Sequence, residues 1–189
     1  MITVGIDPGN SGAYAVVGVN GDVRHIVVKP MPTTQQKLTT KTKSGNAKTH
    51  TELDIHALAT DLHAVITDMV STKKVELVPL VFVCEQVGAM PGQGVVSMFN
   101  FGDSFGQLKA LGRLFNHDGI RPSVMLVRPQ SWKKTILAGT AKDKDAAVNY
   151  VKNKHPTVSL LPTERSKVPH EGMAEAVCIA EWGISNWRA

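Results

Sequence analysis

The chain has 189 residues, of which 42% are hydrophobic and 20% are charged. This length allows one domain with a substantial core, and the composition excludes an intrinsically disordered chain and a membrane protein. No segment approaches the ~20 consecutive apolar residues that span a bilayer, and the N-terminus lacks a signal-peptide pattern, so we expect a protein of the cytosol.

The net charge of +5 and the pI near 9.3 favour a polyanionic partner. Lysine and arginine release counterions when they neutralise phosphates, although charge alone does not separate nucleic-acid binding from solubility. The two cysteines, Cys84 and Cys178, lie in apolar segments without the spacing of a zinc or redox motif. We therefore expect buried thiols in a reducing compartment.

The first thirty residues predict a three-stranded meander. Its strands are ITVGIDPG, GAYAVVGVN and VRHIVVKPMP, joined by turns at 9–12 and 20–22. Residues 33–52 that follow are polar and basic, and Glu52 is their only acid. This composition predicts a basic, flexible loop at about 35–51.

The rest of the chain alternates helical and strand patterns. Apolar residues at three- and four-residue steps predict a helix over 53–69, and LVPLVFVCE predicts a buried strand that ends at Glu85. A Gly-rich segment and a helix follow, then a strand SVMLVRP, a charged helix from near Lys142, and an apolar helix from Pro169. This order predicts an α/β fold with a mixed sheet, three antiparallel strands and then parallel ones, flanked by helices.

Acidic side chains recur where sites form in such sheets. Asp7 and Glu85 each end an apolar strand, and Glu171 and Glu175 lie one turn apart on the last predicted helix. Such carboxylates repel one another unless they hold a hard divalent cation such as Mg²⁺ or Mn²⁺. Two ions about 3.5–4 Å apart can catalyse phosphodiester hydrolysis. We therefore predict Asp7, Glu85 and Glu175 as metal ligands, with Glu171 or His170 completing the site.

Each acid alone also has an ordinary explanation. Asp7 can cap a turn, Glu85 can end a strand in solvent, and Glu171 suits a helix N-terminus. Glu175, inside a run of small apolar residues, is the hardest to explain in this way. On a regular helix Glu171 lies about 40° around the axis from Glu175 and His170 about 140°, which favours Glu171 as a ligand. His170 would then be a proton shuttle, a phosphate contact or a cap.

The segments GIDPGNSGA, CEQV, MPGQGVVSMFNFGDSFGQLKAL, VRPQSWKK and HEGMAEAVCIAEW, in this order, resemble the RuvC-type Holliday junction resolvases, particularly those of bacteriophages. The resemblance implies a ribonuclease H-like fold, a homodimer, and paired symmetric nicks in four-way junction DNA with Mg²⁺ or Mn²⁺. It places the family's first aspartate on Asp7, its glutamate on Glu85 and its final acid on Glu175. The family's remaining acid or histidine falls on Gly172, so that role passes to Glu171 or His170.

The resemblance also implies residues that contact DNA. Bacterial members carry an aromatic residue soon after the glutamate, and here Phe99 or Phe101 would replace it, whereas Trp132 is expected in the core. The lysines that the resemblance places on phosphates are Lys133, Lys134, Lys142 and Lys144. The basic loop lies outside the resemblance, and its charge alone suggests that Lys37, Lys41, Lys43 and Lys48 add phosphate contacts.

Three rival functions remain open. An actin-like ATPase would use residues 7–12 to hold phosphate, but it needs a second phosphate loop that the sequence lacks. A junction-binding module could have lost its nuclease activity, and a ribonuclease H-like nuclease could act on other branched DNA or RNA–DNA hybrids. The favoured prediction is one nuclease domain over 1–189, in a bacterial cytosol or a phage-infected host cell.

Overall fold

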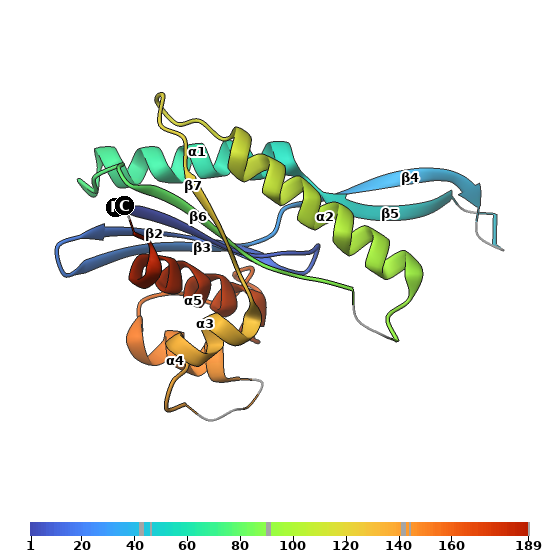
Figure 1. The fold of residues 1–189 in the computed structure, drawn as a ribbon. Coiled ribbons are helices and arrows are strands. Elements are labelled where there is room, and N and C mark those ends of the chain that lie inside the picture. Colours follow the sequence, from blue (N-terminus) through green and yellow to red (C-terminus); the bar gives the residue numbers. More distant parts are fainter. Residues whose placement is uncertain (42–43, 46, 90–91, 141–142, 144, 189) are drawn as a thin grey trace.

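The computed structural model describes residues 1–41, 44–45, 47–89, 92–140, 143 and 145–188 (Figure 1). Its strands are β1 (Ile2–Asp7), β2 (Ala13–Asn20), β3 (Val23–Pro30), β4 (Thr33–Lys41), β5 (Ala47–Leu53), β6 (Leu80–Glu85) and β7 (Ser123–Val127). Its helices are α1 (Ile55–Ser71), α2 (Val95–Leu114), α3 (Pro129–Ile136), α4 (Ala146–Lys154) and α5 (Glu171–Asn186).

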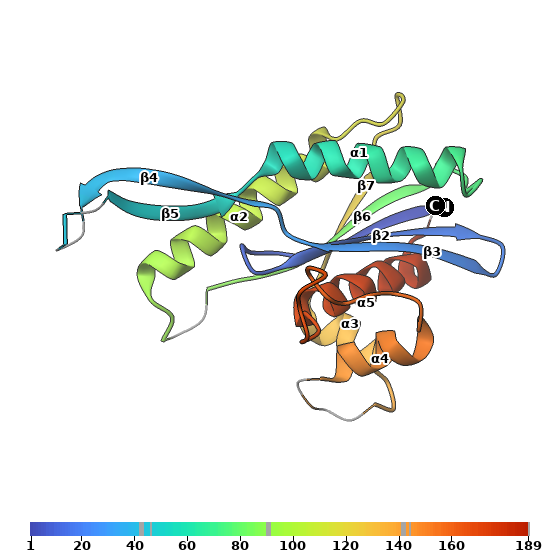
Figure 2. The same cartoon turned by 180° about the vertical axis from the view of Figure 1, so that it is seen from behind.

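Five strands form one mixed sheet in the order β3-β2-β1-β6-β7. The first three strands are antiparallel neighbours, while β1, β6 and β7 run parallel to one another. Helices α1 and α2 cover one face of the sheet, and α5 with α3 and α4 covers the other (Figures 1 and 2). The predicted α/β class, with antiparallel strands followed by parallel ones, is confirmed.

Side chains of the central strand β1 alternate between two buried layers. Ile2, Val4 and Ile6 belong to the core beneath α1 and α2. The intervening residues face α5, and Gly5 lies so close to that helix that a Cβ there would come within 2.2 Å of the Ala176 carbonyl oxygen. A glycine at this position therefore lets α5 pack directly on the sheet, which fixes the height of the helix above the strand ends.

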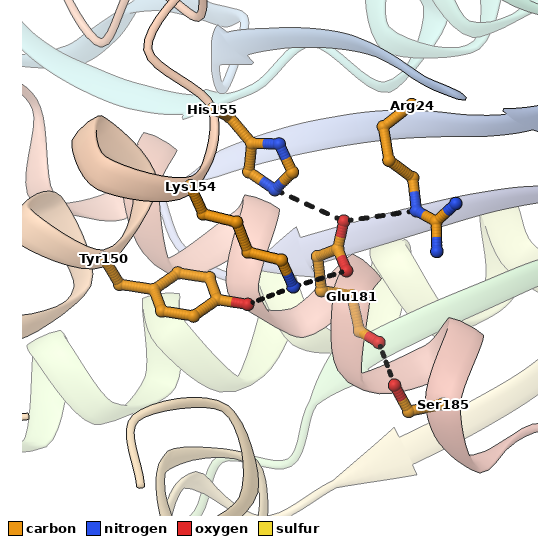
Figure 3. A network of polar contacts seen from close by, with 6 residues as sticks. All are labelled: Arg24, Tyr150, Lys154, His155, Glu181 and Ser185. Carbon is orange, nitrogen blue, oxygen red and sulfur yellow. Dashed lines mark hydrogen bonds and ion pairs between the residues drawn. The ribbon is translucent and has the colours of Figure 1, made fainter. Parts of the chain in front are cut away.

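A buried charge network holds the far half of α5. One oxygen of the Glu181 carboxylate lies 3.4 Å from Lys154 Nζ, and the other lies 3.6 Å from Arg24 Nε and 3.4 Å from His155 Nε2 (Figure 3). The Glu181 residue is only 4% exposed. The network joins β3 and the end of α4 to α5, and the charges of Arg24 and Lys154 offset the cost of desolvating the buried carboxylate.

The prediction of a flexible loop at about 35–51 is wrong for the described residues of this segment. Strands β4 and β5 form an antiparallel hairpin there. The hairpin projects past the main sheet beside the first turns of α2 (Figures 1 and 2). Its side chains are largely exposed on both faces, so it has no apolar alternation for a sequence pattern to detect. Threonine, which favours strands, supplies much of its local preference.

Helix boundaries differ from the expected ones by a few residues. Helix α1 begins at Ile55 rather than residue 53 because the Asp54 carboxylate accepts a hydrogen bond from the Ala57 backbone N–H, at 2.9 Å. Helix α4 begins at Ala146 rather than near Lys142, which lies outside the described residues. Helix α5 begins at Glu171, so Pro169 precedes the helix rather than starting it.

The close approach at Gly5 predicts a large loss of stability in Gly5→Ala. The added methyl group would collide with the α5 backbone, and such overpacking costs about 1–3 kcal/mol or more. Gly106→Ala is the matched control, because no heavy atom lies within 4 Å of its added Cβ and alanine favours a helix. Urea unfolding should show Gly5→Ala destabilised and Gly106→Ala unchanged or more stable. Equal stabilities of the two variants would contradict this packing.

Candidate active site

The carboxylates of two neighbouring parallel strands lie at the same edge of the sheet. Ile6 of β1 pairs with Cys84 of β6, so the next residues, Asp7 and Glu85, end their strands side by side. Side chains two residues apart on a strand share a face. Gly5 and Val83 both face α5, so Asp7 and Glu85, two residues further along their strands, face it as well. The predicted convergence of these two acids is therefore present.

Helix α5 brings the other two predicted acids to this edge. Glu171 is its first residue and Glu175 lies one turn further on. Gly172 touches Asp7 directly, since a Cβ built on Gly172 would lie 2.6 Å from Asp7 Oδ2 and 3.1 Å from His170 Cε1. A side chain at 172 would collide with the Asp7 carboxylate, so a larger residue here could be accommodated only if Asp7 moved.

Burial and mutual repulsion make Asp7 hard to ionise. Its pKa is raised to about 8, first by burial and then by the negative charges of Glu175 and Glu85, with a smaller contribution from Glu171. The positive charge of Lys133 acts in the opposite direction. The four predicted acids thus share one electrostatic environment, which favours binding of a cation.

Two adjacent residues of α3 bind two of these acids. The buried Trp132 indole donates a hydrogen bond from Nε1 to Glu85 Oε1 at 2.7 Å, and Lys133 Nζ lies 2.7 Å from Glu175 Oε1. Burial raises the pKa of Glu85, and the Trp132 hydrogen bond opposes that rise. Burial lowers the pKa of Lys133, but the hydrogen bond and charge of Glu175 outweigh it, so the net shift is upward.

His170 is the N-cap of α5 in this structure. Its Nδ1 accepts a hydrogen bond from the Met173 backbone N–H at 3.2 Å, which is one of the roles that the sequence left open for it. Glu171 is exposed at the start of the helix and contributes to the Asp7 electrostatics. The choice between Glu171 and His170 for the fourth catalytic position stays a prediction.

The acids fit a divalent cation by chemistry, since carboxylate oxygens are the ligands that Mg²⁺ and Mn²⁺ prefer. Among the residues that the structure describes, however, no three His, Cys, Asp or Glu side chains converge closely enough to hold an ion. Glu175 instead directs an oxygen at Lys133. Binding a metal in the predicted way therefore requires a rearrangement of side chains.

Two cavities flank the site, and Phe101 of α2 lines both. One, of about 560 Å³, lies along residues 8–11 after β1, and the other, of about 430 Å³, is lined by Glu85, Gln86 and Arg128 among others. The half-buried Phe101 ring packs over Gly9, where a Cβ would lie 3.0 Å from Phe101 Cε2. Phe99 lies outside these cavities with 76% of its surface exposed.

The remaining predicted DNA contacts are only partly described. Lys134 is exposed on α3 beside Lys133. Lys43, Lys142 and Lys144 lie outside the described residues, and only the backbone of Lys41, in β4, is described.

Sequence reasoning missed the role of Trp132. The residue is fully buried, as expected for the core, but it also donates its indole N–H to Glu85. A tryptophan directly before two lysines, just after a strand, was the available signal. The partner lies 47 positions away, so no local pattern could identify it.

Comparisons with known proteins give distant structural likenesses. Neither a protein-family model nor a curated protein matches the sequence. The structure is similar to RuvC of Thermus thermophilus in complex with a Holliday junction substrate, with 14% identity, a TM-score of 0.48, and coverage of 95% of this chain and 90% of that one. A second structure of Thermus thermophilus RuvC has 17% identity and a TM-score of 0.44, with 95% of this chain and 91% of that one covered.

The yeast mitochondrial Holliday junction resolvase Ydc2 is a third similar structure, with 16% identity and a TM-score of 0.48 over 94% of this chain and 75% of that one. At these scores and identities the likenesses assign no activity and no residue role to this chain. In the described part of the chain, every helix is too short or too polar to cross a membrane.

The raised pKa of Asp7 predicts that the metal-free protein loses stability as the pH rises. The carboxyl group binds its proton more tightly in the folded state, with a pKa of about 8, than at the ordinary value of 3.8. Its contribution is therefore fully present below about pH 4 and is lost as the pH rises to about 8, by at most about 5 kcal/mol. Urea unfolding in EDTA at pH 5 and pH 8 should show this loss in wild type and a smaller one in Asp7→Asn. An identical pH dependence in both would contradict it.

The Trp132–Glu85 hydrogen bond predicts a specific defect in Trp132→Phe. The phenyl ring keeps most of the apolar packing but removes the N–H donor, and a hydrogen bond to a charged group is worth about 1.5–3 kcal/mol. Because this hydrogen bond opposes the rise in the pKa of Glu85, we expect that pKa to rise further in Trp132→Phe, as measured by NMR titration. Trp182→Phe, at the other end of α5, is the control and should leave the pKa of Glu85 unchanged. Equal Glu85 pKa values in the two variants would show that Trp132 acts only in packing.

Proposed function

We propose that this protein is a metal-dependent, structure-selective endonuclease that resolves four-way DNA junctions by paired symmetric nicks. The observation that carries the proposal is the set of carboxylates around Asp7, which raise its pKa to about 8 together with burial. Such a concentration of negative charge beside a lysine-bearing helix suits phosphodiester hydrolysis, which needs carboxylate-bound cations and little else from the protein.

Asp7, Glu85 and Glu175 would hold the metal, with Glu171 or His170 as the fourth participant and two ions as the expected number. When bound, Mg²⁺ or Mn²⁺ would supply an activated water for in-line attack and stabilise the leaving oxygen, giving 5′-phosphate and 3′-hydroxyl ends. For Glu175 to hold a metal in this way, its ion pair with Lys133 would have to open.

The chain's own residues would bind and orient the DNA strand. Lys133, once released from Glu175, lies next to Lys134 on α3, where both can neutralise phosphate charge. Trp132 keeps the Glu85 carboxylate in one orientation. Phe101, between two cavities, and the exposed Phe99 are the candidates for stacking on a base at the junction.

The choice of a four-way junction as substrate rests on the sequence motifs that resemble RuvC-type resolvases. A homodimer suits that substrate, because a two-fold molecule presents two identical sites to a junction of approximate two-fold symmetry. We propose that the protein acts in the cytosol of a bacterium or of a phage-infected host cell. The carboxylates also suit a ribonuclease H-like nuclease that acts on other branched DNA or on RNA–DNA hybrids, which is the second candidate.

Asp7→Asn should abolish cleavage of a labelled four-way junction while leaving junction binding within about threefold of wild type. The amide removes the charge needed for a metal but keeps the shape of the side chain. Asp22→Asn, in an exposed turn between β2 and β3, is the matched control and should cut normally. The assay compares junction, linear duplex and RNA–DNA hybrid, each with Mg²⁺, Mn²⁺ or EDTA.

Paired nicks in the junction alone, dependent on metal and on Asp7, are the expected result. Cleavage of the hybrid or the linear duplex would support the second candidate instead. Tight junction binding without any nicking would contradict an enzyme and indicate a binding module, and wild-type cutting by Asp7→Asn would contradict the proposed site.

A further inference from the structure

The β4–β5 hairpin extends from the edge of the sheet that carries the candidate active site. Strands β1 and β6 run toward the hairpin and end at Asp7 and Glu85 (Figure 1). Residues 33–53 contain four lysines and one acid, Glu52. Glu52 lies near the base of the hairpin, opposite Thr34, so the only charged side chains in the sequence of the outer part, residues 37–49, are lysines.

The base of the hairpin is fixed to the loop that follows Asp7. Asn10 donates a hydrogen bond from Nδ2 to the Thr51 carbonyl oxygen at 2.6 Å, and Asn10 Oδ1 accepts one from Ser104 Oγ of α2 at 3.4 Å. The Asp54 backbone N–H closes the base by donating to the Pro32 carbonyl oxygen at 2.9 Å. The hairpin therefore has a set position relative to Asp7, whereas a mobile loop would not.

The hairpin presents a cation on each of its two faces. Lys37 pairs with Thr49 across the ribbon and shares its face, so Lys48, the neighbour of Thr49, faces the opposite way. Both lysines are exposed. A two-stranded ribbon fits the major groove of a DNA duplex, where rows of phosphates flank it on both sides. The nine residues of β4 span at most about 30 Å, because the register shifts between Lys37 and Lys41, and one turn of duplex is about 34 Å.

We propose that the β4–β5 hairpin is a duplex-binding arm that contacts one arm of the DNA substrate about one helical turn from the site of cleavage. The inference rests on the proposed function and deepens it, because it assigns the partner of a surface outside the catalytic residues. Lys37 and Lys48 bind phosphates on the two sides of the groove. The connection through Asn10 then sets the distance between the held arm and Asp7.

The first test measures the salt dependence of binding to a long linear duplex and to a four-way junction. Each lost phosphate contact lowers the slope of log Kd against log salt by about 0.9, so Lys37→Ala/Lys48→Ala should lower it by about 2. Lys73→Ala/Lys74→Ala is the control, because these exposed lysines follow α1 at the opposite end of the molecule. Equal slopes for the two double variants would overturn the inference.

The second test varies the length of the junction arms. In a shortened variant, an Asn-Gly turn joins Gln36 directly to His50, which are opposite one another in the hairpin. Wild type should bind arms of about two helical turns at least about fivefold more tightly than arms of about half a turn, and the shortened variant should bind both alike. Full retention of the arm-length effect in that variant would contradict the proposal.

The outcomes separate this inference from the proposed function. Duplex binding with a slope that depends on Lys37 and Lys48, but without junction cleavage, would leave the hairpin inference standing and remove the proposed function. Normal junction cleavage, with the same salt slope in Lys37→Ala/Lys48→Ala as in wild type, would support the proposed function and overturn the hairpin inference. A change of oligomeric state in the shortened variant, with unchanged slopes in the lysine variant, would identify the hairpin as a protein contact and overturn the inference.

Discussion

Repulsion among carboxylates at one edge of the sheet is the constraint on which the rest of the site depends. The charges of Glu175 and Glu85 raise the pKa of the largely buried Asp7, and the charge of Glu175 also raises that of Glu85. In the protein alone, Lys133 offsets part of this repulsion through its ion pair with Glu175. A divalent cation would offset it more fully, which is what the proposed function requires of these acids.

The scaffold holds these acids in place by packing rather than by local contacts among them. The small residues of α5 allow it to lie directly on Gly5, and the buried Glu181 network joins the far half of that helix to β3 and α4. These interactions fix the position of Glu175 relative to Asp7. Helix α3 contributes from the other side, because its Trp132 and Lys133 each bind one acid.

Much of the architecture could be predicted because apolar periodicity and strand-end acids are local signals. The strands that end at Asp7 and Glu85, and the helix that carries Glu175, follow from such patterns. The hairpin could not be predicted because its exposed faces lack an apolar alternation, and its strands depend on cross-strand pairing. The Trp132–Glu85 contact and the collision of any side chain at 172 with Asp7 arise only from tertiary packing.

The most direct measurement is calorimetric titration of the protein with Mn²⁺ at pH 7, in buffers of different ionisation enthalpy. With a pKa of about 8, Asp7 is largely protonated at this pH and must release its proton to bind a metal. The account predicts Mn²⁺ binding with release of about one proton per site in wild type, and much weaker binding in Asp7→Asn. Equal Mn²⁺ affinity and equal proton release in the two proteins would contradict it.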